Sequence, residues 1–360
     1  MYEVTVLDLS ALVSMSNRYG ANPAYVLAGG GNTSIKEDDC MYVKASGTKL
    51  ATITEDGFVP VSRKALRATM EKAYPESDKE REAAFLQDVQ TSRILPGETR
   101  RPSVEALLHA LFPQKFVLHI HPAKLNGLTC SIEGENAAKR IFGDSIIWIP
   151  LCRPGYILGK LCWDAMAEFK KANGYDADVI LLQNHGVFVA ANTLEEIDQL
   201  FNKVYGAIEC LVERTADFSE SVSSCEKLAA DVAAKAGYAF ALHCGSSEAV
   251  KLSASKEAAA PLLRPFTPDH IVACGAFPFY AESVNDVKPT GKNRVVILKD
   301  YGYFAMGEDE RAAKIVASLV DDALCIAAAT ESFGGPLHMT EEMTDFITNW
   351  EAESYRRKQF

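Results

Sequence analysis

Three histidines lie in two short motifs whose spacing could hold a metal ion. The motif HIHP occupies residues 119–122, at the end of an apolar run, and NHG occupies residues 184–186. Side chains two apart on a strand point to the same face, so His119 and His121 should project together. His185, at the end of another predicted strand, would complete a three-ligand site with an open position for substrate. Imidazole ligands suit zinc, with manganese, cobalt and iron as alternatives.

The alternative for a His-x-His pair alone is two hydrogen-bonded imidazoles without a metal, and a single His185 before a glycine would more often be structural. Three such histidines in one α/β chain, two of them on one strand face, favour the metal site.

An acidic residue precedes the first histidine motif. Pro102 and Ser103 should open a helix that runs to about Phe112, with Ser103 as the N-cap and Glu105 in the first turn. There Glu105 could complement the helix dipole. It could instead lie beside the metal and act as a general acid or base. The spacing alone leaves both interpretations open.

A glycine-rich segment, GGGNTS at residues 29–34, is followed by SGT at residues 46–48. Glycine-rich backbone lets N–H groups converge on an anion, and neighbouring hydroxyls add donors. The segment is therefore either a phosphate or carboxylate site or a flexible turn. Lys44 and Lys49 could add positive charge or remain solvated surface. The segment matches neither the GxGxxG dinucleotide fingerprint nor a Walker loop.

The apolar periodicity predicts an α/β protein, because strands and helices alternate along the chain. The expected helices lie at 8–19, 63–73, 79–93, 103–112, 134–142, 160–172 and 193–217, and the expected strands at 41–44, 116–121, 146–150 and 178–190.

The last third of the chain echoes the part that carries the histidines. Residues 296–304 read VILKDYGYF and resemble ILLQNHGVF at residues 180–188, with Tyr301 where His185 stands. We interpret this as a degenerate second unit that kept the scaffold and lost a ligand. The predicted domains are residues 1–225, which carry the motifs, and a C-terminal α/β region, residues 226–360, packed on them. Further helices are expected at 226–236, 308–330 and 341–357.

The composition excludes several classes of protein. Among 360 residues, 48% are hydrophobic and 24% charged, as in ordinary globular proteins, and the net charge is -11 without a basic cluster, so we expect no nucleic-acid binding. No apolar run is long enough to cross a membrane, and the N-terminus lacks the basic segment of a signal peptide. The nine cysteines are scattered without a CxxC pair, which predicts reduced thiols in a cytoplasmic protein.

The ordered set GGGNTS, SGT, PSVE, HIHP and NHG resembles the class II aldolase/adducin family, from about residue 10 to 215. It is similar to L-fuculose-1-phosphate and L-rhamnulose-1-phosphate aldolases, and most like the aldolase part of bifunctional rhamnulose-1-phosphate aldolase/alcohol dehydrogenases. The resemblance implies a three-layer α/β/α fold with a central mixed sheet. It also implies a homo-oligomer, commonly a tetramer, in which a neighbouring subunit supplies a tyrosine that we cannot match to a position here.

The resemblance implies roles for individual residues. His119, His121 and His185 would bind zinc, and Glu105 would be the acid/base. A phosphate would be held by residues of the two glycine-containing segments and the PSVE motif: Gly31, Asn32, Ser46, Gly47 and Ser103.

Two features depart from the pattern of the family. Phosphate-binding aldolases such as the fuculose enzyme have a second hydroxyl residue where Val104 stands, and valine cannot donate a hydrogen bond. The bifunctional enzymes continue into a dehydrogenase domain, whereas this sequence ends at Phe360 without a nucleotide-binding fingerprint, so we expect no oxidoreductase activity.

The expected function is reversible retro-aldol cleavage of a ketose 1-phosphate of the rhamnulose or fuculose type to dihydroxyacetone phosphate and an aldehyde. Three alternatives remain. The same site could decarboxylate a phosphorylated 3-oxo sugar acid. A pentulose-phosphate 4-epimerase is less favoured, since such epimerases carry Asp where Glu105 stands. A non-enzymatic binding protein, as in the adducin branch, is disfavoured because all three histidines remain.

Overall fold

The computed structural model describes residues 7–350, which form two compact units. Residues up to Pro122, together with Ala138–Ala207, make the first unit. Ala123–Ala137, together with the chain from Ile208 onward, make the second. The predicted domain boundary between residues 225 and 226 stays a prediction, because contacts do not test which segment folds alone.

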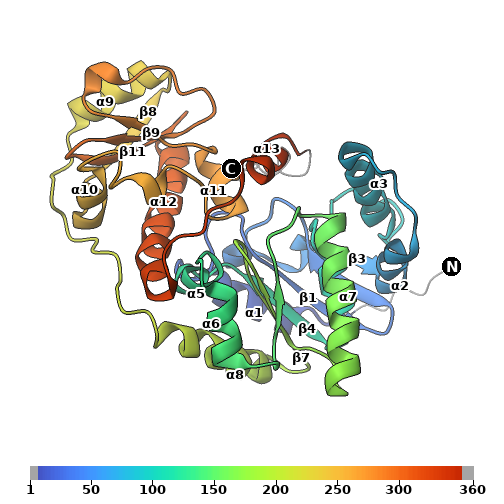
Figure 1. Cartoon of the computed structure of the whole chain (residues 1–360). Coiled ribbons are helices and arrows are strands. Elements are labelled where there is room, and N and C mark those ends of the chain that lie inside the picture. Colours follow the sequence, from blue (N-terminus) through green and yellow to red (C-terminus); the bar gives the residue numbers. More distant parts are fainter. Residues whose placement is uncertain (1–6, 351–360) are drawn as a thin grey trace. The chain divides into compact units, whose positions relative to one another are not determined.

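A seven-stranded mixed sheet forms the centre of the first unit (Figure 1). The strand order is β3-β2-β1-β4-β7-β6-β5, and all neighbours are antiparallel except β5 and β6. This is the mixed sheet that the family resemblance implied. The strands are β1 (Asn32–Glu37), β2 (Cys40–Lys44), β3 (Phe58–Ser62), β4 (Phe116–Ile120), β5 (Ile147–Ile149), β6 (Val179–Leu182) and β7 (Gly186–Ala191).

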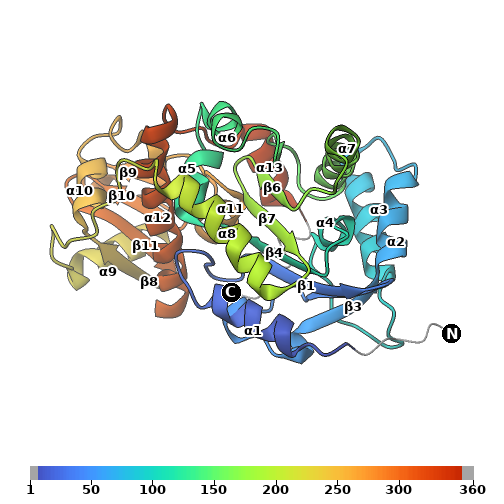
Figure 2. The same cartoon turned by 90° about the horizontal axis from the view of Figure 1, so that it is seen from below.

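Helices cover both faces of this sheet, as Figure 2 shows from below. On one face Phe85, Leu107 and Leu158, each from a different helix, share an apolar core with Phe188 of β7. On the other face the ring of Tyr19 meets that of Phe201 edge-on at 5.4 Å. The first face carries α2 (Arg63–Ala68), α3 (Asp78–Thr91), α4 (Ala106–Leu111) and α7 (Tyr156–Asn173), and the second carries α1 (Ser10–Gly20) and α8 (Leu194–Glu209).

Some predicted elements differ from the structure. The expected helix 63–73 ends as α2 at Ala68 and continues as one 3₁₀ turn to Glu71. The expected strand 178–190 is two antiparallel strands, β6 and β7, because Asn184 adopts a positive φ of 55° and turns the chain. The expected helix 103–112 begins only at Ala106. The expected helix 193–217 ends as α8 at Glu209.

A four-stranded sheet with the order β8-β11-β10-β9 forms the centre of the second unit. Apolar residues of α9, such as Val232, pack on one face against Val296 and Phe304. On the other face Tyr303 donates a hydrogen bond to Asp321 of α12 at 2.7 Å. The strands are β8 (Phe240–Cys244), β9 (Phe279–Ala281), β10 (Val295–Leu298) and β11 (Gly302–Gly307); the helices are α5 (Ala123–Thr129), α9 (Glu226–Ala236), α10 (Ser247–Ser253), α11 (Pro268–Cys274), α12 (Glu310–Thr330) and α13 (Glu341–Asn349).

One predicted helix contains the division between the two units, and another extends past the last residue that the structure describes. Helix α6 (Gly134–Phe142) contains the division between the two units. The predicted helix 341–357 is present as α13 up to Asn349, and its residues from 351 onward lie outside the described part of the chain.

The second sheet repeats the order and directions of four strands of the first. Strands β4-β7-β6-β5 correspond to β8-β11-β10-β9, and each set has one parallel pair, at its last two strands. In the first set His119 is the register partner of Phe188, and in the second His243 is the partner of Phe304. Each imidazole stacks on its phenyl ring, with centroids 4.0 Å and 4.7 Å apart. The echo in the sequence is therefore an echo of topology and register.

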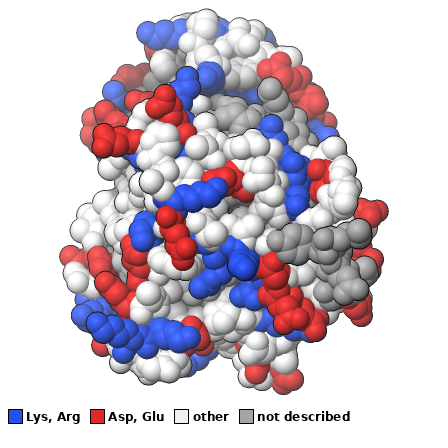
Figure 3. Space-filling view, turned by 90° about the vertical axis from the view of Figure 1, so that its right-hand side faces the viewer, with Lys and Arg blue, Asp and Glu red and all other residues white. Residues whose placement is uncertain are grey.

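The distribution of surface charge, the cysteines and the lengths of the helices can be compared with the predictions made from composition. Acidic and basic side chains are interspersed on the face that Figure 3 shows, rather than gathered by sign. All nine cysteines lie in the described part and are free thiols. Within residues 7–350 no helix combines the length and apolar character that crossing a bilayer requires.

Candidate metal centre

His119 is held in one orientation by its strand and by a backbone carbonyl. It lies on β4, is fully buried, and stacks on Phe188. Its Nδ1 lies 3.0 Å from the carbonyl oxygen of Val187. A carbonyl only accepts, so Nδ1 carries the hydrogen and Nε2 presents a lone pair. Metal-binding histidines commonly show this arrangement, because a backbone acceptor on one ring nitrogen orients the other.

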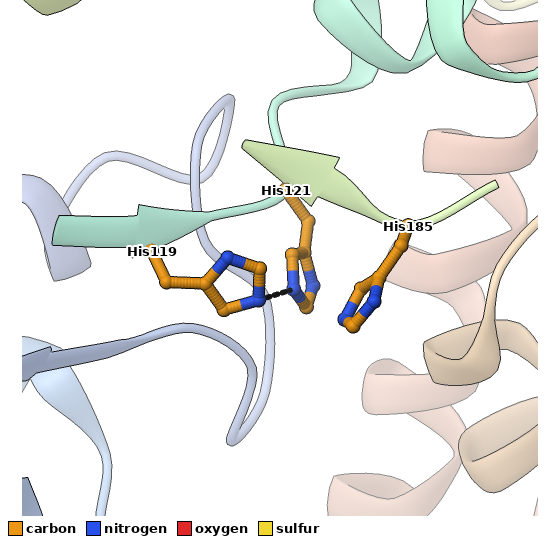
Figure 4. Close-up of side chains that lie close together, drawn as sticks. All are labelled: His119, His121 and His185. Atoms are coloured by element: carbon orange, nitrogen blue, oxygen red, sulfur yellow. Dashed lines mark hydrogen bonds between the residues drawn. The ribbon is translucent and has the colours of Figure 1, made fainter. Parts of the chain in front are cut away.

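The other two imidazoles converge on the same point (Figure 4). His121 follows directly after β4, and its Nε2 lies 2.9 Å from Nε2 of His119. His185 comes from the turn between β6 and β7, and its ring centroid lies 5.0 Å from that of His119. One ligand atom from each histidine lies within 4.8 Å of the others. The structure thus brings together His119, His121 and His185, which strand periodicity and the two motifs had predicted as ligands of one metal.

Gly186 lets the turn that carries His185 approach β4. A Cβ at this position would lie 2.5 Å from the carbonyl oxygen of Ile120 and 2.6 Å from Cδ2 of His121. Only glycine fits without a shift of the backbone. The glycine of the NHG motif is therefore part of the site, because it sets the distance between two of the histidines.

Glu105 points at the histidines, not along its helix. It is the N-cap residue of α4 rather than a first-turn residue, and its side chain makes no capping hydrogen bond. Its Oε1 lies 3.4 Å from Nε2 of His119 and 3.3 Å from Nε2 of His185. Ser103, the predicted N-cap, accepts a hydrogen bond from the Glu105 N–H at 3.2 Å instead. Of the two interpretations that the spacing left open, the geometry favours a carboxylate beside the histidines.

The electrostatics of Glu105 reflect two opposed effects. Burial raises the pKa of its carboxyl, but the neighbouring imidazoles of His119, His185 and His121 outweigh burial and hold that pKa well below its ordinary value. The buried Oε1 has no hydrogen-bond partner among the described residues. A buried carboxylate oxygen without a donor, facing two imidazole nitrogens at 3.3 Å and 3.4 Å, fits the presence of a cation at this point.

A further histidine near Glu105, His109, was not singled out from the sequence. His109 lies one helical turn after Glu105, is fully buried, and hydrogen-bonds to Oδ1 of Asn32. Asn32 in turn donates from Nδ2 to Oε2 of Glu105 at 2.6 Å. The spacing of four residues, which places side chains on one face of a helix, was the available signal.

The predicted phosphate residues are only partly brought together. Ser46 lies beside the PSVE motif, because its N–H donates to the Arg101 carbonyl at 2.8 Å and its Oγ donates to the Pro102 carbonyl at 3.2 Å. Ser103 N–H donates to the Lys44 carbonyl at 2.9 Å, and Gly47 is exposed in the same turn.

The glycine loop contributes differently from the expectation. The side chain of Asn32 faces Glu105 and His109. Gly31 has a φ of +64°, and a Cβ there would meet the His119 carbonyl oxygen at 2.8 Å. Gly31 thus lets the loop pass close to β4, and the predicted roles of Gly31 and Asn32 in binding a phosphate stay predictions.

Comparison with known proteins identifies the family. Residues 11–211, more than half of the chain, match the family model described as "Class II Aldolase and Adducin N-terminal domain". The chain belongs to the class II aldolase and adducin family. Members of this family are generally lyases, and class II aldolases are typically metal-dependent.

Individual relatives differ in how much they share. The "Uncharacterized oxidoreductase YuxG" of Bacillus subtilis (strain 168) is 30% identical over 193 residues, which cover 51% of this chain and 26% of that protein. The chain thus spans about a quarter of the length of this curated relative. A class II aldolase domain of a conserved Thermoplasma acidophilum protein is 27% identical, with a TM-score of 0.48, over 59% of this chain and 98% of that one. An L-fuculose-1-phosphate aldolase from Thermus thermophilus is 15% identical, with a TM-score of 0.36, over 56% of this chain and 92% of that one.

Proposed function

We propose that this family member is a metal-dependent carbon–carbon lyase that cleaves a ketose 1-phosphate reversibly to dihydroxyacetone phosphate and an aldehyde. One observation carries the proposal. The buried Oε1 of Glu105 has no hydrogen-bond partner in the described part of the chain and faces two of three convergent imidazoles, at 3.3 Å and 3.4 Å. This arrangement places a proton acceptor beside a metal site, which is what enolate chemistry needs.

We propose that His119, His121 and His185 hold the metal ion, with zinc as the first choice because three neutral imidazoles suit it. The hydrogen bond from His119 Nδ1 to Val187 supports its role, since it leaves Nε2 as the ligand atom. When bound, the cation would supply a Lewis acid that stabilises negative charge on the oxygens of the substrate.

Glu105 would move the proton at C3 of the sugar. In the direction of condensation its carboxylate removes a proton from C3 of dihydroxyacetone phosphate, and C3 then bonds to the aldehyde carbon. In the direction of cleavage the C3–C4 bond breaks and the C4 hydroxyl gives its proton to a water molecule as the aldehyde forms. The carboxyl of Glu105 gives its proton to C3 and regains one from water before the next turnover. The carboxylate form of Glu105, which a general base requires, is available near neutral pH.

The phosphate of the substrate would lie at Ser46, Gly47 and Ser103, which the structure places in neighbouring segments. The side chain of Asn32 is left out of this proposed pocket, because it is hydrogen-bonded to Glu105. Val104 beside Ser103 offers no donor, so this pocket would have fewer hydroxyls than the fuculose enzyme.

The family resemblance also supports two wider proposals. The protein would work as a homo-oligomer, commonly a tetramer in this family, and its scattered free thiols suit the cytoplasm. Analytical ultracentrifugation of the full chain would show the first directly.

The test of the proposed function begins with metal content. Elemental analysis of protein purified without added metal should find about one zinc per chain, and the variant with His119, His121 and His185 all changed to alanine should contain none. The matched control is His243→Ala, because His243 is buried and stacked on Phe304 as His119 is on Phe188. This control should keep its metal, so that loss in the triple variant is not a general effect of removing a buried imidazole.

Activity is then measured by screening aldehydes with dihydroxyacetone phosphate. Glu105→Gln should keep its metal but lose most turnover, by roughly 100-fold or more for a general base. Carbon dioxide release from a phosphorylated 3-oxo sugar acid, without aldol activity, would show the decarboxylase instead, and interconversion of pentulose phosphates would show the epimerase. A protein that takes up no metal on reconstitution would refute the lyase and favour an adducin-like binding role.

A further inference from the structure

A continuous chain of buried hydrogen bonds ends at Glu105. Oγ of Ser34 lies 2.8 Å from Nδ1 of His109. Nε2 of His109 hydrogen-bonds to Oδ1 of Asn32, and Nδ2 of Asn32 donates to Oε2 of Glu105 at 2.6 Å. Ser34 and His109 are fully buried and Asn32 is 5% exposed. The chain therefore connects the middle of β1 to the carboxylate without passing through water.

The carboxylate of Glu105 fixes the direction of donation along this series of hydrogen bonds. The Oε2 oxygen of Glu105 accepts, so Asn32 must present its NH₂ group to it and its Oδ1 to His109. Since an amide oxygen only accepts, Nε2 of His109 must carry the hydrogen. Nδ1 then has the lone pair and accepts from the hydroxyl of Ser34. A flip of Asn32 would bring its Oδ1 face to face with the carboxylate oxygen Oε2 of Glu105, and the two acceptors would repel each other.

The surroundings of His109 favour a neutral ring. Burial lowers the pKa of this imidazole well below its ordinary value, and the cation of Lys36, two residues after Ser34 on β1, lowers it further. Phe188 meets the ring edge-on at a centroid distance of 5.4 Å. The same phenyl ring stacks on His119, with the ring centroids 4.0 Å apart.

We propose that His109 is a positioning residue for Glu105. Acting through Asn32, it keeps Oε2 as a hydrogen-bond acceptor whether Glu105 is ionised or protonated, so that the proton exchanged with substrate resides on Oε1. Oε1 is the oxygen that faces His119 and His185. This inference rests on the proposed function, because it assumes that Glu105 exchanges a proton with C3.

The opposing view is that His109 only fills space in the core. Both views predict that replacing it destabilises the protein, so stability does not separate them. The positioning role alone depends on where the donor lies, at the Nε2 position of the ring rather than at Nδ1. Glutamine can place an amide donor near the former Nε2, whereas asparagine is shorter and reaches only the Nδ1 position.

The experiment compares His109→Gln with His109→Asn in the zinc-loaded full chain. The measured step is exchange of the C3 hydrogen of dihydroxyacetone phosphate with deuterium from solvent, followed by NMR without any aldehyde. We expect His109→Asn to slow exchange about 10- to 100-fold, the range for leaving the buried amide oxygen of Asn32 without its donor. His109→Gln should retain most of the rate, and the KM for dihydroxyacetone phosphate and the zinc content should stay near wild type in both. Equal rates in the two variants, whether both fast or both slow, would overturn the proposal.

Glu105→Gln separates this proposal from the one on which it rests. If the wild-type holoenzyme exchanges no hydrogen at C3, or if Glu105→Gln exchanges at the wild-type rate, the role of Glu105 fails. If Glu105→Gln stops exchange while both His109 variants match wild type, only the role of His109 fails. His243→Gln is the matched control, a buried histidine on the repeated strand of the second unit, and should exchange as wild type.

A measurement without core substitutions covers the case in which the variants do not fold. The ¹⁵N chemical shifts of histidine rings distinguish the two neutral tautomers and the cation. In zinc-loaded wild-type protein, His109 should show a protonated Nε2 and an unprotonated Nδ1, as the hydrogen-bond direction requires. A ring protonated at Nδ1, or at both nitrogens, would overturn the proposal.

Discussion

The steric role of Gly186 leads to a prediction that joins scaffold and site. In Gly186→Ala the new Cβ would lie 2.5 Å from the carbonyl oxygen of Ile120, whereas real Cβ contacts stay above 3.0 Å. The turn must therefore move by about half an ångström away from β4. Overpacking of this kind costs about 1–3 kcal/mol of unfolding free energy. A functional site must be held within about 0.5 Å of its productive geometry, and this shift reaches that limit. Zinc affinity should therefore fall by about tenfold or more, as it does when other groups that orient metal ligands are changed.

The repeated sheet provides the control for this substitution. Gly302 begins β11 as Gly186 begins β7, and a Cβ there would lie 2.4 Å from the carbonyl oxygen of Cys244. Its φ of +94° adds backbone strain for alanine, so Gly302→Ala should lose at least as much stability as Gly186→Ala. It should nevertheless bind zinc as wild type, because its turn carries Tyr301 in place of a histidine.

Urea unfolding measures the first effect of Gly186→Ala, and competition with a zinc chelator measures the second. Wild-type zinc affinity in Gly186→Ala would refute the view that the NHG glycine sets the distance between His121 and His185. Equal loss of zinc in Gly302→Ala would show that the affinity follows general stability and not the local geometry.

Three further predictions concern stability. Burial lowers the pKa of Lys36 well below its usual value, so the unfolded chain binds the proton of this side chain more tightly than the folded protein does. Lys36→Met should therefore raise the free energy of unfolding by about 1–3 kcal/mol at pH 7, and this gain should shrink as pH rises toward 10. A variant that is less stable than wild type in urea unfolding at pH 7 would contradict the burial penalty. Burial raises the pKa of Glu82, so the folded state loses stability as pH rises above about 4.5. Glu82→Gln should gain stability relative to wild type as pH rises above that value in the same assay, and a gain that falls with pH would refute the sign. Gly206→Ala in α8 meets open space and should raise stability by about 0.5–1 kcal/mol, measured by thermal unfolding; a lower Tm would show an unseen contact there.

The second unit shows what a short sequence repeat predicted and what it did not. The resemblance of residues 296–304 to 180–188 predicted a repeated scaffold, and the structure repeats strand order, directions and register. In this register His243 stands where His119 stands, so Gly245 and Tyr301 stand where the other two histidines would be. The correspondence of His243 was not visible in the sequence, because β8 and β11 are far apart along the chain and only their pairing aligns them.

Strand periodicity was sufficient to place His119 and His121 on one face, since that relation involves only neighbouring residues. The motif set was sufficient to identify the family, which the match over residues 11–211 confirmed. The sequence did not decide how Glu105 is used, because a carboxylate at a helix start suits the helix dipole as well as a metal site.

Tertiary structure decided the relations between distant segments. The pairing of β1 with β4 places Asn32 opposite His119. Helix α4 then brings Glu105 and His109 to the same amide, so the side chain of Asn32 contacts both the carboxylate and an imidazole. These contacts depend on strands and helices that meet only after folding, and the energy of each buried polar group depends on which partner it finds there. Residue type and spacing determined which groups could do chemistry, and the packing of the sheet determined which of them act on one another.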